Sequence, residues 1–137
     1  MKVMLISQRL LEKAVKLHGH LGPFLVLGLK MSLRAKKILG EKPGKCEVET
    51  INSRPFLCVV DGIKAVIESD AVTVREGNGL AVKFGKVNGK EVMLKVKRAI
   101  IEKYAQGPWE RCEEYAYEVM KSKDEELFEY AFCLTIH

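Results

Sequence analysis

Apolar residues in the first forty positions recur every three or four residues, which is the spacing of amphipathic helices. The first run predicts a helix over residues 7–19, beginning at Ser7, a good N-cap. The second predicts a helix over residues 23–39, because proline suits a first helical turn and Gly40 is a typical C-terminal stop. Gly19 and Gly22 interrupt the pattern between the two helices.

The middle of the chain changes to a two-residue period, which is typical of strands. Alternation of Cys46 and Val48 with glutamates predicts a strand over residues 46–51. The apolar run from Pro55 to Ile67 keeps helical spacing, so we interpret it as a helix. Strand-like stretches follow at residues 71–76, 80–86 and 90–97. The pairs Asn78-Gly79 and Asn88-Gly89 separate them and predict a three-stranded meander.

The last third is helical in pattern, with predicted helices at residues 98–105, 108–121 and 123–131. The order ααβαβββααα predicts an α+β fold, with helices packed on one mixed, mostly antiparallel sheet of about four strands. The length of 137 residues fits a single domain over residues 1–137.

Charge is unevenly distributed along the chain, which carries a net charge of +5. Residues 1–45 are strongly basic and residues 101–137 are acidic. The two regions either attract each other, within a chain or between subunits, or the basic one binds an anion. Few aromatic residues lie near the basic region, which argues against nucleic acid. No apolar run suits a membrane span and the first residues lack a secretory pattern, so we expect a cytoplasmic protein.

The four cysteines are scattered and form no Cys-x-x-Cys pair. Neither a zinc finger nor a disulfide framework is expected from this spacing. We interpret Cys46, Cys112 and Cys133 as structural, and Trp109 as a core or interface residue.

Two residue groups carry candidate chemistry. His18 and His20 flank Gly19 at the predicted helix junction, where they are either metal ligands or polar helix-end residues. Cys58 is either a small buried apolar residue or a ligand, and Asp61 follows on the same helical face. A carboxylate in an apolar helix needs a partner, which a cation shared with a thiolate and an imidazole would supply.

Several motifs, in order, resemble those of the formylmethanofuran dehydrogenase FmdE family. The segment from Leu17 to Gly28 resembles the family's opening His-Gly-His-x-Cys-Pro motif, and the segment from Cys58 to Lys64 resembles its Cys-x-x-Asp-Ala-Ile-Gln motif. The later segments Thr73 to Leu80 and Phe84 to Lys86 resemble its Gly-Asn turn and aromatic-Gly-Lys motifs. Gly22 departs from the pattern, since the family has cysteine there.

The resemblance implies an α+β domain, often a homodimer, with a metal-associated cleft. Carried over by position, it implies His18, His20 and Cys58 as metal ligands with Asp61 in support, and zinc as the expected divalent metal. His20 and Asp61 are then the candidates for proton transfer. Partners would be the other chains of a molybdenum- or tungsten-dependent oxidoreductase.

Two other functions stay open from the residues alone. The chain is either a non-catalytic partner or scaffold protein that docks through its basic helices, or a module that binds a small anion or nucleotide. In the second case, the free amides at the start of the second helix would hold the anion.

Overall fold

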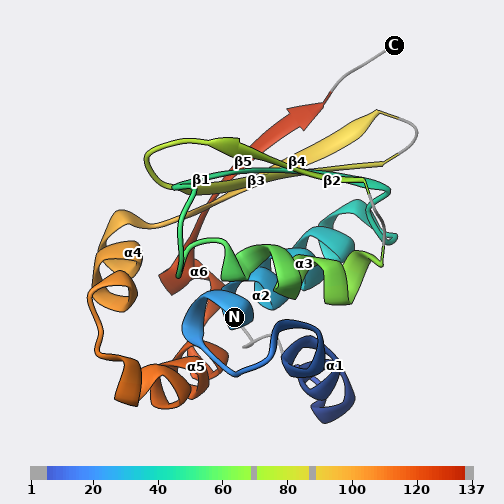
Figure 1. Ribbon diagram of the computed structural model, residues 1–137. Helices are drawn as coiled ribbons and strands as arrows, with labels where there is room; N and C mark the ends of the chain where they lie inside the picture. Colours follow the sequence, from blue (N-terminus) through green and yellow to red (C-terminus); the bar gives the residue numbers. More distant parts are fainter. Residues whose placement is uncertain (1–5, 69–70, 87–88, 135–137) are drawn as a thin grey trace.

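All helices lie on one side of a single sheet or at its end (Figure 1). The computed structural model describes residues 6–68, 71–86 and 89–134, with side chains through residue 129. The helices are α1 (Gln8–His18), α2 (Pro23–Leu39), α3 (Cys58–Ile67), α4 (Arg98–Ala105), the 3-10 helix η1 (Trp109–Arg111), α5 (Cys112–Lys121) and α6 (Asp124–Leu127). The strands are β1 (Lys45–Thr50), β2 (Val72–Glu76), β3 (Leu80–Gly85), β4 (Lys90–Val96) and β5 (Phe128–Leu134). The α+β class and the mixed, mostly antiparallel sheet are therefore confirmed.

The α1–α2 junction forms as the sequence predicts. The Leu10 amide donates a hydrogen bond to Ser7 Oγ, which caps α1. Gly19 ends α1 with φ +110°, a backbone conformation that favours glycine. Pro23 then opens α2 directly after Gly22. The chain thus turns sharply within four residues and starts a helix whose residues from Pro23 to Ser32 are all buried.

Helices α2 and α3 cross in close contact beneath the sheet. A Cβ atom built on Gly28 would lie 2.2 Å from the Val59 carbonyl oxygen, and one on Gly62 would lie 2.2 Å from the Leu25 carbonyl oxygen. Only glycine at both positions permits this approach. The predicted helix start at Pro55 is three residues early, because residues 54–57 form a turn and α3 begins at Cys58. The crossing brings the first turns of both helices to the same end of the molecule.

The predicted meander is wrong in its first pairing. The sheet order is β2-β1-β3-β4-β5, so β2 pairs in parallel with β1 and is not a hydrogen-bonded neighbour of β3. Gly77-Asn78-Gly79 crosses the end of β1 instead of making a hairpin, and the Gly77 amide donates to the Thr50 carbonyl oxygen at 2.9 Å. The β3–β4 pairing is antiparallel as predicted, although Asn88 in its turn lies outside the described residues.

The predicted helix over residues 123–131 is correct only to Leu127. From Phe128 the chain becomes β5, which pairs antiparallel with β4 and makes the sheet five-stranded. Alternating aromatic residues at 128, 130 and 132 carried this strand signal. The tertiary pairing with β4 overrides the local helical spacing.

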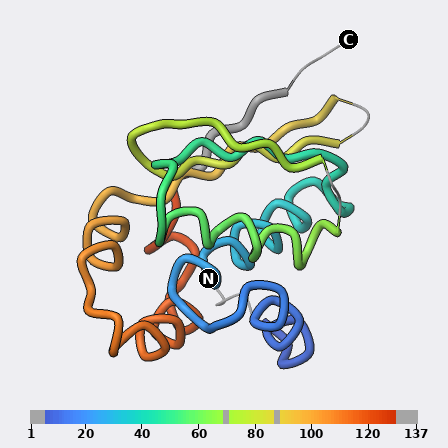
Figure 2. The backbone as a smooth tube through the Cα atoms, viewed as in Figure 1, coloured from blue at the N-terminus to red at the C-terminus, as the bar shows by residue number. Residues whose placement is uncertain are grey.

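The basic beginning and the acidic end of the chain meet inside the fold. Arg34 Nε lies 2.5 Å from Asp124 Oδ2, and Lys30 Nζ donates to the Ser122 carbonyl oxygen at 2.5 Å. Figure 2 shows the last third of the chain, from orange to red, passing beside the blue helices. Attraction within the chain is therefore confirmed at these contacts. Within the described ranges, no helix is long and apolar enough to cross a membrane.

Candidate functional site

The α1–α2 junction holds both candidate histidines. His18 is the last residue of α1, and the left-handed turn at Gly19 redirects the chain before His20. Two residues that would diverge on a continuous helix are thereby brought together. Their ring centroids lie 4.7 Å apart.

His18 is held by Asp61 from the first turn of α3. The His18 Nδ1 and Asp61 Oδ2 atoms are 2.7 Å apart, and the histidine side chain is only 5% exposed. Since an ionised carboxylate can only accept, Nδ1 carries the hydrogen and donates it. His18 Nε2 is buried and has no hydrogen-bond partner among the described residues. The ring is thus fixed in orientation and presents a nitrogen with no protein partner.

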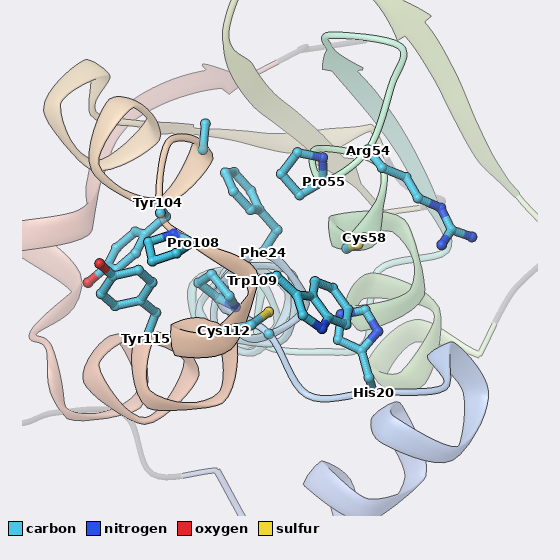
Figure 3. Close-up of a pocket in the computed structure, with 14 residues that line it drawn as sticks. His20, Phe24, Arg54, Pro55, Cys58, Tyr104, Pro108, Trp109, Cys112 and Tyr115 are labelled. Atoms are coloured by element: carbon cyan, nitrogen blue, oxygen red, sulfur yellow. The ribbon is translucent and has the colours of Figure 1, made fainter.

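A pocket of about 300 Å³ opens beside this junction (Figure 3). One end is aromatic, with Tyr104 and Tyr115 packed edge to face at 5.3 Å between centroids. The other end holds His20, Cys58 and Cys112. The remaining lining residues are Gly22, Pro23, Phe24, Arg54, Pro55, Ala105, Gly107, Pro108 and Trp109. The pocket therefore joins an apolar compartment to a small group of imidazole and thiol donors.

Both pocket thiols begin a helix. Cys58 is the first residue of α3 and Cys112 is the first residue of α5. Burial raises the pKa of each thiol. At neutral pH the thiols are therefore protonated unless a cation binds beside them.

Arg54 supplies positive charge at the pocket. Its side chain is exposed, and no hydrogen bond or ion pair holds its guanidinium group among the described residues. Its charge opposes the burial effect on the Cys58 thiol and helps to lower the pKa of His20. The N-terminus of α2 faces the same pocket through Gly22, Pro23 and Phe24.

The protonation of His20 can be followed through Trp109, the only tryptophan in the chain. The two ring centroids are 4.8 Å apart, and an imidazolium at that distance quenches indole fluorescence. Burial, followed by the charges of His18 and Arg54, lowers the pKa of His20 below 6.5. In metal-free protein, we expect Trp109 fluorescence to fall with a midpoint below pH 6.5.

The same shift sets a stability trend. Because folded His20 binds a proton less readily than unfolded His20, its contribution to stability declines as pH falls below 6.5 through the lowered pKa. His20→Gln should remove the fluorescence step. A midpoint at or above pH 6.5 in the parent would contradict the expected environment of His20.

A family model described as "FmdE, Molybdenum formylmethanofuran dehydrogenase operon" matches residues 17–129. The chain belongs to the FmdE family. The FmdE match spans both histidines of the junction, both pocket thiols and the aromatic end of the pocket. A search of curated proteins found no match.

A solved structure shares the FmdE fold. It is the crystal structure of a tungsten formylmethanofuran dehydrogenase FmdE-like protein from Syntrophus aciditrophicus. The TM-score is 0.60 at 16% sequence identity, covering 94% of this chain and 72% of the other. At this identity the likeness establishes the architecture alone.

The FmdE fold brings together most of the residues that the sequence singled out. His18, His20 and Asp61 form one connected group, and Cys58 lines the pocket together with His20. Within the described part of the chain, however, no three His, Cys, Asp or Glu side chains are arranged as a ready metal centre. The donor chemistry still suits zinc, since the buried nitrogen of His18 lacks a partner and two thiols lie at the pocket.

Sequence reasoning missed several pocket residues of this FmdE domain. Trp109 is 70% exposed and contacts His20, so it is not a core residue, and its place at an interface stays a prediction; the sequence did not indicate its position in the pocket. Cys112 lies in the pocket beside Gly22, so its interpretation as merely structural missed a pocket thiol. Neither position has a neighbouring motif, and only the break at Gln106-Gly107-Pro108 marked the region. Cys46 is buried in the sheet, as expected of a structural cysteine.

Proposed function

We propose that this FmdE domain binds a divalent metal ion, zinc being the first candidate, through His18, His20 and Cys58. The proposal rests on the hydrogen bonding of the two ring nitrogens of His18. Metal-binding histidines usually donate their second ring N–H to a carboxylate, which fixes the ring and raises its basicity. His18 has this arrangement with Asp61, and its buried Nε2 has no partner among the described residues.

The neighbouring residues have separate roles in this proposal. Asp61 orients His18 and is a positioning residue. His20 is therefore the remaining candidate for proton transfer, in the state in which its imidazole is not bound to metal. The pocket wall is mostly apolar and would hold the apolar part of a ligand, and Arg54 would attract an anionic group of it. Zinc held by three protein ligands would keep an open position and supply Lewis acidity there, whereas a fourth protein ligand would close the site.

The partners follow from the family rather than from the pocket. The family description refers to a molybdenum formylmethanofuran dehydrogenase operon. This supports an accessory role beside the subunits of a molybdenum or tungsten oxidoreductase, with a homodimer as the expected assembly. The scaffold alternative shares these partners but requires no metal.

A small-anion function is the second candidate, and two features of the pocket favour it. Arg54 is unpaired within the described residues, and the free amides of α2 begin at the same pocket. An anion held there would need neither thiol. The two candidates therefore differ in whether binding depends on His18 and Cys58.

The metal proposal is tested by zinc content and affinity of untagged full-length protein. We expect one zinc per chain, its loss in His18→Ala, and an affinity about 10–100-fold lower in Asp61→Asn. Asparagine keeps the size of the side chain but orients the histidine less strongly. Zinc is measured by elemental analysis and by competition with a chelator.

Glu68→Gln provides the matched control. Glu68 is an exposed carboxylate just beyond α3 that pairs with Lys13 and Lys42, so its loss should leave zinc affinity unchanged. A parent that holds no zinc above background after incubation would overturn the metal proposal. If that protein is instead stabilised by phosphate in an Arg54-dependent way, the small-anion function is supported.

A further inference from the structure

Gly22 is not explained by its backbone. Its φ of −150° and ψ of 169° are extended values that any residue adopts. What opposes a side chain there is a sulfur atom, because a Cβ built on Gly22 would lie 2.8 Å from Cys112 Sγ. The Cys112 sulfur thus occupies the space that a side chain at residue 22 would fill.

The same point in space is close to His20. The Cβ built on Gly22 would lie 3.5 Å from His20 Nε2, so Cys112 Sγ and His20 Nε2 both border the space beside Gly22. In a tetrahedral zinc site, a sulfur and a nitrogen ligand are about 3.5 Å apart. The Cys112 and His20 side chains would have to rotate toward this common space for both atoms to reach one ion.

Cys112 also lies near the second thiol. Cys58 and Cys112 line the same pocket, and burial is the main cause that raises the pKa of Cys58, ahead of the charges of Asp61 and Cys112. Figure 3 shows both sulfur atoms and the His20 ring at the end of the pocket away from Tyr104 and Tyr115. Each thiol begins a ten-residue helix, where the positive end of the helix dipole favours a thiolate.

We propose that Cys112 supplies a second thiolate to the metal site, from the space left by the absent side chain of residue 22. The inference rests on the proposed metal function and adds a fourth donor to His18, His20 and Cys58. Two imidazoles and two thiolates make a complete tetrahedral set for zinc. Each thiol releases its proton to solvent as its sulfur–zinc bond forms, and no oxidant is needed.

The geometry explains why the donor comes from α5. Residue 22 and residue 112 share one space, so a side chain at residue 22 would require the Cys112 sulfur to move. A cysteine at residue 22 would displace Cys112, whereas the same change with Cys112 removed would return a thiol to nearly the same region. This exchange distinguishes a ligand from a residue that merely fills space.

The test titrates cobalt(II) alone into reduced protein and records the thiolate-to-cobalt absorption band together with affinity. We expect Cys112→Ala to lose roughly half of the parent's band, since one of two thiolates is gone. Its affinity should fall by at least about 100-fold, more than for loss of an outer partner. The double variant Gly22→Cys/Cys112→Ala should recover both properties.

Cys46→Ala is the matched control, because Cys46 is a buried thiol in β1. It should keep the parent's band, and circular dichroism should show every variant folded. If Cys112→Ala keeps the parent's band and affinity while Cys58→Ala loses them, Cys112 is not a ligand and the metal function stands. If the parent binds no cobalt, this inference and the proposed function both fail.

Discussion

Replacing Asp124 with alanine is expected to lower the free energy of unfolding by about 3–5 kcal/mol, because it leaves buried positive charge without its partner. Asp124 is 1% exposed and pairs with Arg34 at 2.5 Å. The fully buried Lys30 lies in the same group, and burial lowers its pKa despite the attraction of Asp124. Urea-induced unfolding monitored by circular dichroism measures the loss.

Two further variants separate charge from packing. Lys30→Met in the Asp124→Ala background should recover part of the stability, since it removes a buried ammonium group. Glu114→Ala breaks the exposed pair with Arg111 and should leave the unfolding midpoint unchanged. An Asp124→Ala protein as stable as the parent would show that Lys30 and Arg34 can be buried without the charge of Asp124.

This buried ion-pair group also has a bearing on the site. Lys30 and Arg34 extend from α2, and their partners Ser122 and Asp124 follow directly after α5. The contacts therefore fix α5 against α2. Gly22 lies directly before α2 and Cys112 begins α5, so the same contacts hold these two residues next to each other. Loss of Asp124 should thus weaken metal binding as well as stability.

Replacing Gly28 with alanine is expected to destabilise the protein by about 3 kcal/mol or more, because the new methyl group would overlap the Val59 carbonyl oxygen. Alanine favours helix by about 1 kcal/mol over glycine, so any loss reports the packing of α2 on α3. Gly62→Ala should behave alike, since it opposes the Leu25 carbonyl oxygen. The measurement is the thermal unfolding midpoint.

Gly79→Ala is the matched control for this crossing. The nearest atom to a Cβ at Gly79 is 3.9 Å away, so alanine fits there without displacement. A Gly28→Ala protein that unfolds with the parent would show that the helices can separate at little cost. If the expected loss occurs, the displaced start of α3 should also move Cys58 away from His20.

The sequence predicted what depends on neighbours along the chain. The turn at Gly19, the start of α2 at Pro23 and the inward-facing Cys46 and Val48 of β1 all follow from local spacing and backbone preference. For Asp61 the sequence predicted only that this carboxylate in an apolar helix requires a partner. The structure identifies that partner as His18. These features were therefore accessible without a structure.

What the sequence could not supply depends on pairing across long separations. An Asn-Gly turn has the same local sequence pattern whether or not the two strands that it connects are neighbours in the sheet. Asn78-Gly79 therefore predicted a β2–β3 hairpin, although β1 lies between these two strands. The proximity of Cys112 to Gly22 has no signature at either residue. Only the packing of α5 against α2 creates it.

The position of β1 has a consequence for how the chain reaches its fold. The first strand to be synthesised becomes an inner strand, and its parallel partner β2 follows only after α3 has been made. Closing that loop costs chain entropy before its contacts form, so folding should be slower than in a helical bundle of equal length. Until β5 is made, β4 also exposes an unpaired edge, which is where a nascent chain would recruit a neighbour or a chaperone.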